Sequence, residues 1–219
     1  MTNNQLQIQS FVFGPFQTNC YVVSDEQQVL LIDPACYTPY EQQQLYNYIN
    51  RQSIVNCQSS NRQLSIVATH GHLDHLWGAK WATDTWHTPV LMHEADIPMA
   101  KAMQQQYDLF GIRATAEAFP IEPLGANPPR LADLKIIETP GHTPGSICLY
   151  FPQSPISNLQ SPILLSGDTL FQMGYGRTDL PGGNMGQLIT SLEHLFTLPS
   201  DVRVYPGHGD FTTIGAEKR

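Results

Sequence analysis

Three histidines and one aspartate lie close together in the chain, at His70, His72, Asp74 and His75. They follow the apolar run 64–68, which predicts a buried strand. Because His70 and His72 are separated by one residue, an extended segment would point both imidazoles the same way. A turn after them would bring the aspartate and the third histidine to the same cavity. Ligands of these types select zinc, iron or manganese over calcium and magnesium, so the cluster predicts a metal site rather than a histidine-rich surface loop.

Three later polar residues stand in glycine and proline turns at the ends of apolar runs. They are His142 in segment 139–146, Asp168 in segment 166–169 and His208 in segment 205–209. Glycine and proline fix sharp turns whose backbone can pass close to a metal. For each residue alone, a turn-forming or capping role is an equal alternative. Together with the first cluster, the three residues supply a complete set of metal ligands.

With these residues the chain resembles the metallo-β-lactamase superfamily, and within it a short form of the glyoxalase II-like (hydroxyacylglutathione hydrolase-like) branch. The H-x-H-x-D-H core at 70–75 carries the resemblance to the superfamily, and weaker loop motifs carry the resemblance to the branch. Those motifs are residues 16–21, 31–34, 174–179 and 206–209. The resemblance spans nearly the whole chain. It implies a four-layer αβ/βα sandwich, with two sheets face to face, helices outside them and the ligands at one edge.

The resemblance also implies two metal sites that share one ligand. The first site would comprise His70, His72 and His142, and the second Asp74, His75 and His208. Asp168 would bridge the two metals, so Asp74 and Asp168 are the residues expected to serve both metal binding and catalysis. Asp33 resembles a carboxylate that orients a ligand imidazole, and a turn-stabilising role explains it equally well.

Two divalent ions in such a site would keep a net positive charge after the charges of Asp74, Asp168 and a hydroxide are subtracted. That charge lowers the pKa of bound water toward neutrality and polarises a carbonyl group. The predicted cofactor is therefore a pair of divalent metal ions, zinc before iron or manganese. The chain has no G-x-S-x-G motif that would supply a serine nucleophile. These features predict a metal-dependent hydrolase.

The four cysteines have structural explanations. Cys20 and Cys148 lie in apolar runs, where a thiol behaves as a small hydrophobe. Cys36 and Cys57 lie in connecting segments. A thiolate metal ligand at one of them is an alternative that the histidines and aspartates make unnecessary. The low cysteine count without paired spacing agrees with a reducing compartment.

Length and charge restrict the class of protein. A chain of 219 residues is expected to form a single domain, 1–219, that buries about 70% of its unfolded surface. The formal net charge of −8 argues against nucleic acid as a partner, because phosphate backbones require clustered Lys and Arg. No apolar run approaches membrane-spanning length, and no basic-then-apolar leader is present. We therefore expect a cytoplasmic enzyme with no membrane partner; the oligomeric state is left open.

Local patterns predict the elements that would position the site. Residues 6–13, 19–24 and 27–32 are expected to be strands, because they are short and rich in β-branched or aromatic residues. Thr38, Pro39 and Glu41 form a capping box that starts a helix. A later helix is expected to begin near Asn184, with Gln187 as the reciprocal cap. Its apolar stripe is expected at Leu188, Leu192, Leu195 and Phe196.

Arg177 is the candidate for substrate contact. It follows the predicted bridging aspartate in a glycine-rich loop, where a fixed cation would suit a carboxylate or a glutathione-like anion. Asp179 stands where the glyoxalase II pattern has an aromatic residue, so an ion pair between Arg177 and Asp179 that stiffens the loop is an equal alternative. Segment 101–129 is expected either to overhang the active site or to pack on the edge of the sandwich.

The resemblance implies a dinuclear-metal hydrolase of an anionic small-molecule thioester, S-acylglutathione in the first place. The alternatives are a persulfide dioxygenase with a single iron, whose relatives share these motifs, and a lactonase of the same superfamily. Full-length glyoxalase II has a helical carboxy-terminal extension that helps to hold glutathione, whereas this sequence has 11 residues after His208. We therefore expect modest efficiency with S-lactoylglutathione and a small penalty when glutathione is replaced by a smaller thiol.

Overall fold

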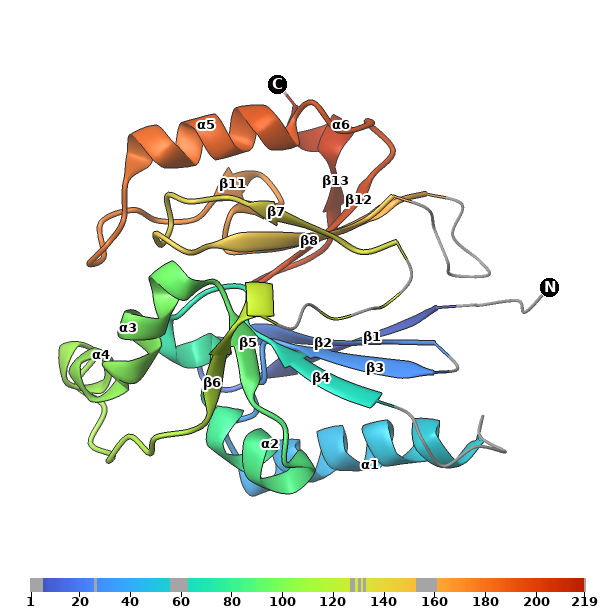
Figure 1. Cartoon of the computed structure of the whole chain (residues 1–219). Helices are drawn as coiled ribbons and strands as arrows, with labels where there is room; N and C mark the ends of the chain where they lie inside the picture. The colour runs from blue at the N-terminus through green and yellow to red at the C-terminus, as the bar shows by residue number, and fades with distance from the viewer. Residues whose placement is uncertain are drawn as a thin grey trace.

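The computed structural model describes residues 6–25, 27–55, 63–126, 129, 131, 133–152 and 161–218. Two sheets lie face to face, with α1 and α2 on the outer face of one and α5 and α6 on the outer face of the other (Figure 1). The first sheet has the strand order β1-β2-β3-β4-β5-β6, and the second has β13-β12-β9-β8-β7. This arrangement confirms the predicted four-layer αβ/βα sandwich.

The strands of the first sheet are β1 (Gln7–Phe13), β2 (Thr18–Ser24), β3 (Gln28–Ile32), β4 (Gln63–Val67), β5 (Val90–Met92) and β6 (Ile121–Pro123). The predicted boundaries of the opening three strands are correct to within one residue. β1, β2 and β3 pair antiparallel, whereas β3, β4, β5 and β6 pair parallel. The carboxyl ends of β3, β4 and β5 therefore meet at one edge of the sheet, and the chain leaves that edge at Asp33, Ala68 and His93.

The strands of the second sheet are β7 (Lys135–Glu138), β8 (Ile147–Phe151), β9 (Ile163–Gly167), β12 (Arg203–Pro206) and β13 (Thr212–Thr213). A short hairpin of β10 (Leu170–Phe171) and β11 (Gly174–Tyr175) follows β9. β9 and β12 run parallel, so the residues that follow them, Asp168 and Gly207, emerge at the same edge. This edge faces the carboxyl ends of the first sheet.

The α-helices are α1 (Pro39–Val55), α2 (Ala79–Trp86), α3 (Ile97–Lys101), α4 (Met103–Leu109), α5 (Met185–Leu195) and α6 (Ile214–Glu217). Single 3₁₀ turns occur at η1 (Leu73–His75), η2 (Glu94–Asp96) and η3 (Leu124–Ala126). The predicted capping box of α1 is present, because Glu41 N donates to Thr38 Oγ1 over 3.3 Å and Thr38 N donates to Glu41 Oε2 over 2.8 Å. These bonds satisfy amide groups that the first helical turn leaves without an internal partner.

The start of α5 agrees with the sequence only in part. Asn184 Oδ1 accepts a hydrogen bond from Gln187 N over 3.0 Å, as an N-cap should. A reciprocal cap would have Asn184 N donate to the Gln187 side chain. Instead, Asn184 N donates to Gly141 O over 2.7 Å. The helix start is therefore joined to the turn that carries His142. Leu188, Leu192 and Leu195 form the predicted buried stripe.

Alternate residues of the central strands serve two different hydrophobic layers. On β3, Leu30 and Ile32 pack between the two sheets, whereas Val29 and Leu31 face α1 and α2. Burial of both faces explains why this strand is a continuous apolar run rather than an alternating one. Cys20 and Cys36 are buried in the layer that faces α1 and α2, and Cys148 is buried in a third layer beneath α5, in agreement with a structural role; Cys57 lies outside the described residues.

Segment 101–129 divides its residues between the two predicted roles. Tyr107 and Phe119 pack against the hydrophobic layer on the helix side of the first sheet. Phe110, directly after α4, instead lines the cavity that contains the predicted metal ligands. Figure 1 shows α3 and α4 together beside the end of the sandwich. Among the described residues, no helix is long and apolar enough to cross a bilayer.

Candidate metal centre

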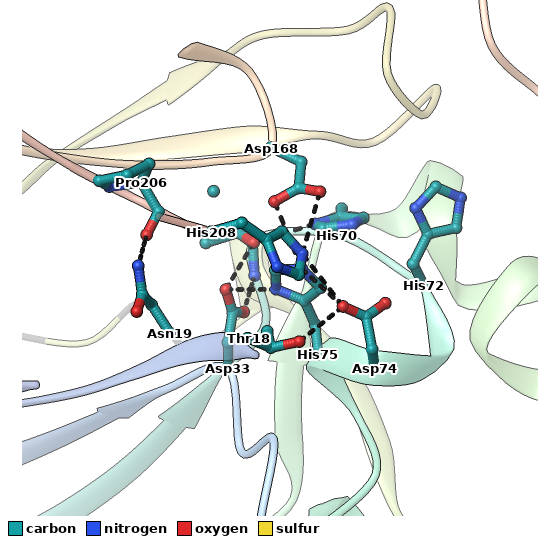
Figure 2. A network of polar contacts seen from close by, with 12 residues as sticks. Thr18, Asn19, Asp33, His70, His72, Asp74, His75, Asp168, Pro206 and His208 are labelled. Atoms are coloured by element: carbon teal, nitrogen blue, oxygen red, sulfur yellow. Dashed lines mark hydrogen bonds and ion pairs between the residues drawn. The ribbon is translucent and has the colours of Figure 1, made fainter. Parts of the chain in front are cut away.

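The facing edges of the two sheets bring all the predicted metal ligands together. His70, His72, Asp74 and His75 leave the end of β4, and the last two occupy the 3₁₀ turn η1. His142 comes from the β7–β8 turn, Asp168 follows β9 and His208 follows β12. Figure 2 shows Asp168 reaching from the second sheet toward residues of the first. The parallel pairs β3–β4 and β9–β12 therefore create the site, because each directs its carboxyl end into the same space.

The ligand atoms form groups that match the predicted division. His70, His72 and His142 make one group and Asp74, His75 and His208 another, and the ligand atoms within each group lie within 4.8 Å of one another. Asp168 lies between them. Its Oδ1 is 3.3 Å from His75 Nε2, and its Oδ2 is 3.6 Å from His142 Nε2. A carboxylate in this position reaches ligands of both groups, as a bridging residue must.

Several buried atoms of this site lack the partners that buried polar groups normally have. Within the described part of the chain, His70 Nε2 has no hydrogen-bond partner, and His75 Nε2 and Asp168 Oδ1, although 3.3 Å apart, form no hydrogen bond with each other or with any other group. Leaving such groups desolvated costs about 1–3 kcal/mol each. A side chain at Gly207 would also be excluded, because its Cβ would lie 2.1 Å from Asp168 Oδ1. The donor types and the orphaned atoms fit metal ions of the zinc, iron or manganese class.

Asp33 fills both roles considered from its position in the sequence. One of its carboxylate oxygens accepts from His75 Nδ1 over 2.9 Å and from Thr69 Oγ1 over 2.8 Å. The other accepts from Thr69 N over 2.7 Å, which stabilises the turn after β4. Asp33 itself has a φ of 52°, a left-handed conformation that aspartate tolerates better than most residues. The carboxylate therefore orients the His75 ring and fixes the loop that carries the histidine cluster.

Backbone and hydroxyl groups orient the other ligands. His142 Nδ1 donates to the carbonyl oxygen of Arg177 over 2.7 Å, and His208 Nδ1 donates to that of Phe16 over 3.1 Å. These bonds leave Nε2 of each ring to face the site. Thr18 Oγ1 donates to Asp74 Oδ2 over 2.7 Å. Such partners fix the tautomer and direction of metal ligands.

Asp96 is a site-supporting residue that the sequence did not reveal. It is fully buried at the end of η2. Its Oδ2 accepts from Gly71 N over 2.8 Å and from Thr143 Oγ1 over 2.7 Å. Its Oδ1 accepts from Gly145 N over 2.6 Å. One carboxylate thus joins the turn between His70 and His72 to the turn that carries His142.

The electrostatics of the site favour neutral imidazoles at His70 and His72, whereas at His75 and His208 the neighbouring carboxylates outweigh burial and raise the pKa. Burial and the neighbouring His142 lower the pKa of His72 to about 3, and burial also holds the pKa of His70 well below its usual value. Burial alone would raise the pKa of Asp74 and Asp168, but the nearby His75 imidazole lowers both. Neutral His70 and His72 and the ionised carboxylates are in the protonation states that metal ligands require, and bound metal ions would displace the protons of His75 and His208.

A cavity of about 420 Å³ opens over Asp74 and Asp168, and Arg177 lies on its wall. The Arg177 guanidinium donates two hydrogen bonds of 2.7 Å to the carboxylate of Asp179. Both side chains are exposed, and the hydrogen bonds from Arg177 lower the pKa of Asp179 to about 2. The ion pair between Arg177 and Asp179 is therefore present, and Arg177 also lines the cavity.

Known proteins resemble this chain over nearly its whole length. A probable metallo-hydrolase, YqgX of Bacillus subtilis, is 33% identical over 94% of this chain and 91% of its own. The hydroxyacylglutathione hydrolase GloC of Haemophilus influenzae is 30% identical, with 93% and 91% covered. The crystal structure of TTHA1623 in a di-iron-bound form has a TM-score of 0.77 and 30% identity, covering 96% of this chain and 97% of that one. The family model of the metallo-beta-lactamase superfamily matches residues 13–208, so this chain, with its sandwich fold and its histidine and aspartate clusters, belongs to that superfamily.

Proposed function

We propose that this metallo-hydrolase cleaves thioesters with two divalent metal ions, and that its substrates include S-acylglutathiones such as S-lactoylglutathione. One observation carries the proposal: two complete ligand groups lie on either side of Asp168 beneath a single open cavity. The relative named hydroxyacylglutathione hydrolase supports the choice of thioester, and the di-iron-bound structure supports a pair of metals. Zinc is our first choice of metal, and iron is the alternative that the di-iron-bound relative supports.

The chain's own residues have defined tasks in this proposal. The two ligand groups and Asp168 would hold the ions, which lower the pKa of water and polarise a substrate carbonyl when bound. Asp33 keeps His75 directed into the site, and the Arg177 carbonyl does the same for His142. The Arg177 guanidinium would attract an anionic group of the substrate to the wall of the cavity.

Hydrolysis then requires a proton to move from the attacking water to the departing thiolate. Asp74 lines the cavity, and its Oδ2 already accepts from Thr18. Its Oδ1 can therefore take the proton as the water oxygen bonds to the carbonyl carbon. The carbon–sulfur bond breaks with its electron pair on sulfur, and the same proton neutralises the thiolate. The products are a carboxylic acid and a free thiol.

The assignment of Asp168 provides the direct test. In Asp168→Ala the two ions would lose their shared ligand, so we expect lower metal occupancy and thioester hydrolysis reduced by more than about tenfold. Metal content is measured by elemental analysis and turnover by thiol release. A matched control is Asp108→Ala on the exposed face of α4. Near-full metal occupancy with wild-type turnover in Asp168→Ala would contradict the bridging role.

A persulfide dioxygenase is the rival from another reaction class. A hydrolase with both ligand groups in use should hold about two ions per chain, release thiol from acylglutathione and consume no oxygen with glutathione persulfide. Elemental analysis of protein purified without added metal and an oxygen electrode distinguish the two. One iron per chain with rapid oxygen uptake would favour the persulfide dioxygenase over the thioester hydrolase. Lactone hydrolysis, measured in parallel, tests the remaining alternative.

A further inference from the structure

A second, apolar cavity of about 350 Å³ adjoins the metal centre. We name it the apolar lobe; it lies between helices α3 and α4 and the loop 180–182. It shares His72, Phe110 and Leu180 with the cavity over the metal centre, so the two spaces adjoin at these residues. Its wall is built largely from Pro98, Met99, Ala102, Leu109, Phe110 and Leu180. A volume of this size is within the range of small-molecule sites.

The apolar lobe has few polar side chains among its described lining residues, namely His72, Gln105 and Gln106. None of the described residues that line it is Lys, Arg, Asp or Glu. The Gln106 amide is already committed, because its Oε1 accepts from Leu73 N over 2.9 Å and its Nε2 donates to the carbonyl oxygens of Gly71 and Met99 over 3.0 and 3.1 Å. The same bonds fix α4 to the loop that carries His72. The lobe is therefore preformed and suited to apolar ligands.

The two spaces differ in the charge of their lining residues, and this difference suits them to different halves of a thioester. The cavity over the metal centre has Arg177 on its wall, whereas no described residue that lines the lobe is a cation for the carboxylates of glutathione. Leu109 and Phe110 are respectively 60% and 40% exposed at the lobe, and an apolar ligand would cover them. Since a thioester extends from its carbonyl carbon in two directions, the anionic thiol belongs beside Arg177 and the acyl group in the lobe.

We propose that the apolar lobe is the acyl-binding subsite and that it selects apolar acyl chains of several carbons over the small, hydroxylated lactoyl group. This proposal rests on thioester hydrolysis as the function. Transfer of one methylene from water to an apolar site contributes about 0.8 kcal/mol, which is roughly a fourfold gain in kcat/KM for each methylene. Four methylenes, from acetyl to hexanoyl, should therefore raise kcat/KM by about two hundredfold.

The first experiment measures kcat/KM for acetyl-, butanoyl-, hexanoyl- and lactoylglutathione with the metal-loaded enzyme. A steady rise from acetyl to hexanoyl, with lactoyl near the acetyl value, supports the subsite. Hydrolysis of the whole series with equal or falling efficiency would overturn the subsite and leave the thioesterase function intact. If no member of the series is hydrolysed, the proposed function itself fails and the subsite fails with it.

A variant pair tests the location. Ala102→Phe should fill the lobe and lower the ratio of hexanoyl to acetyl kcat/KM by about tenfold or more, since most of the chain-length gain is lost. Ala118→Phe, at an exposed position outside the lobe, should leave that ratio unchanged. Equal ratios in the wild type and both variants would mean that the chain-length preference arises elsewhere.

A binding measurement removes the dependence on turnover. In protein labelled with ¹³C at the methionine methyl groups, a non-hydrolysable S-hexyl glutathione thioether should shift the signal of Met99, assigned through Met99→Leu. The signal of Met185, exposed on α5, is the internal control and should not move. A Met99 signal that stays unchanged at saturating thioether, with or without metal, would contradict the proposed subsite.

Discussion

The carboxylate of Asp96 connects loops that the chain places far apart. Its partners Gly71, Thr143 and Gly145 are 25, 47 and 49 residues away. Gly71 lies between His70 and His72, and Thr143 follows His142, so the histidines of one predicted site are positioned together by a residue that touches none of them in the contacts described above. This explains how two turns from different sheets can hold ligand atoms at a fixed separation.

Asp96→Asn should weaken this connection without adding volume. The amide has one acceptor oxygen instead of two, so its NH₂ group would face a backbone N–H in place of a carboxylate oxygen. We expect a loss of about 1–3 kcal/mol in the free energy of unfolding and a metal affinity lower by about tenfold to a hundredfold. Urea denaturation and competition with a chromophoric chelator measure the two effects. Asp84→Asn, on the exposed side of α2, is the control; equal metal affinity in both variants would contradict the positioning role.

Arg177 contributes to the site through two separate groups. Its carbonyl oxygen orients His142, and its guanidinium pairs with Asp179 on the wall of the cavity. Arg177→Ala keeps the carbonyl and removes the cation, so the metal content should be unchanged. We expect KM for an anionic thioester to rise by about three- to tenfold and KM for a neutral one to stay the same. Steady-state kinetics with both substrates provide the test, and a fall in kcat with unchanged KM would contradict it.

At the scale of elements, the start of α1 depends on one carboxylate. Glu41 accepts hydrogen bonds from Gly14 N, Tyr37 N and Thr38 N over 3.0, 2.7 and 2.8 Å. The first contact ties the β1–β2 turn to the helix, and the other two complete the capping box. Burial alone would raise the pKa of Glu41, but these backbone amides lower it below the usual 4.5. The carboxylate is therefore bound more tightly in its ionised form.

Glu41→Gln should lower stability by about 1 kcal/mol at neutral pH, because the charge-assisted bonds become neutral ones. The folded-state pKa is lowered, so this contribution is fully present above the unfolded-state pKa near 4.5 and is lost as the pH falls through the folded-state value. The difference between wild type and variant should consequently shrink below about pH 4. Urea titrations at several pH values measure it, with Glu193→Gln on the exposed face of α5 for comparison. A difference that grows on acidification would refute the assignment.

The sequence predicted those elements whose signals are local. The H-x-H-x-D-H cluster, the capping box and the leucine stripe of α5 each lie within a few turns of the chain, so their spacing determined their geometry. Asp96 has no such signal, since its partners are remote in sequence. The apolar lobe was missed for the same reason: it forms only where α3 and α4 meet the loop 180–182. The bond from Asn184 N to Gly141, which replaces the expected Gln187 cap, is again a contact between distant segments.

At the scale of the whole molecule, the predicted metal centre lies at the contact between the two sheets. Its ligands come from both, and the second sheet is also held to the first by Asn19 Nδ2, which donates to the carbonyl oxygens of Pro206 and Gly209 over 2.9 Å each. Tyr21 donates from its hydroxyl to Pro206 O over 2.7 Å. Metal ions in this position would therefore stabilise the packing of the sheets as well as the local loops.

Removal of metal should lower the melting temperature. A ligand at a hundred times its dissociation constant contributes about 2.7 kcal/mol, and 1 kcal/mol corresponds to about 2–4 °C in a chain of this size. We expect a chelator to reduce Tm by roughly 5–10 °C, and re-addition of zinc or iron to restore it. Calorimetry on the same sample before and after chelation gives the answer. An unchanged Tm after complete demetallation would mean that the packing of the two sheets does not depend on metal.

The contacts between the two sheets join residues that are far apart in the sequence, and this separation affects the order of events during synthesis. The contacts of Asn19 and Tyr21 with the last ligand turn close loops of 185 to 190 residues. A growing chain exposes the 70–75 cluster long before Asp168 and His208 are made, and chains fold as their segments emerge. On the ribosome the first cluster is thus a set of imidazoles and a carboxylate without its partners, able to hold metal only loosely. Loading of both predicted sites would therefore wait until the turn that carries His208 has been made and docked.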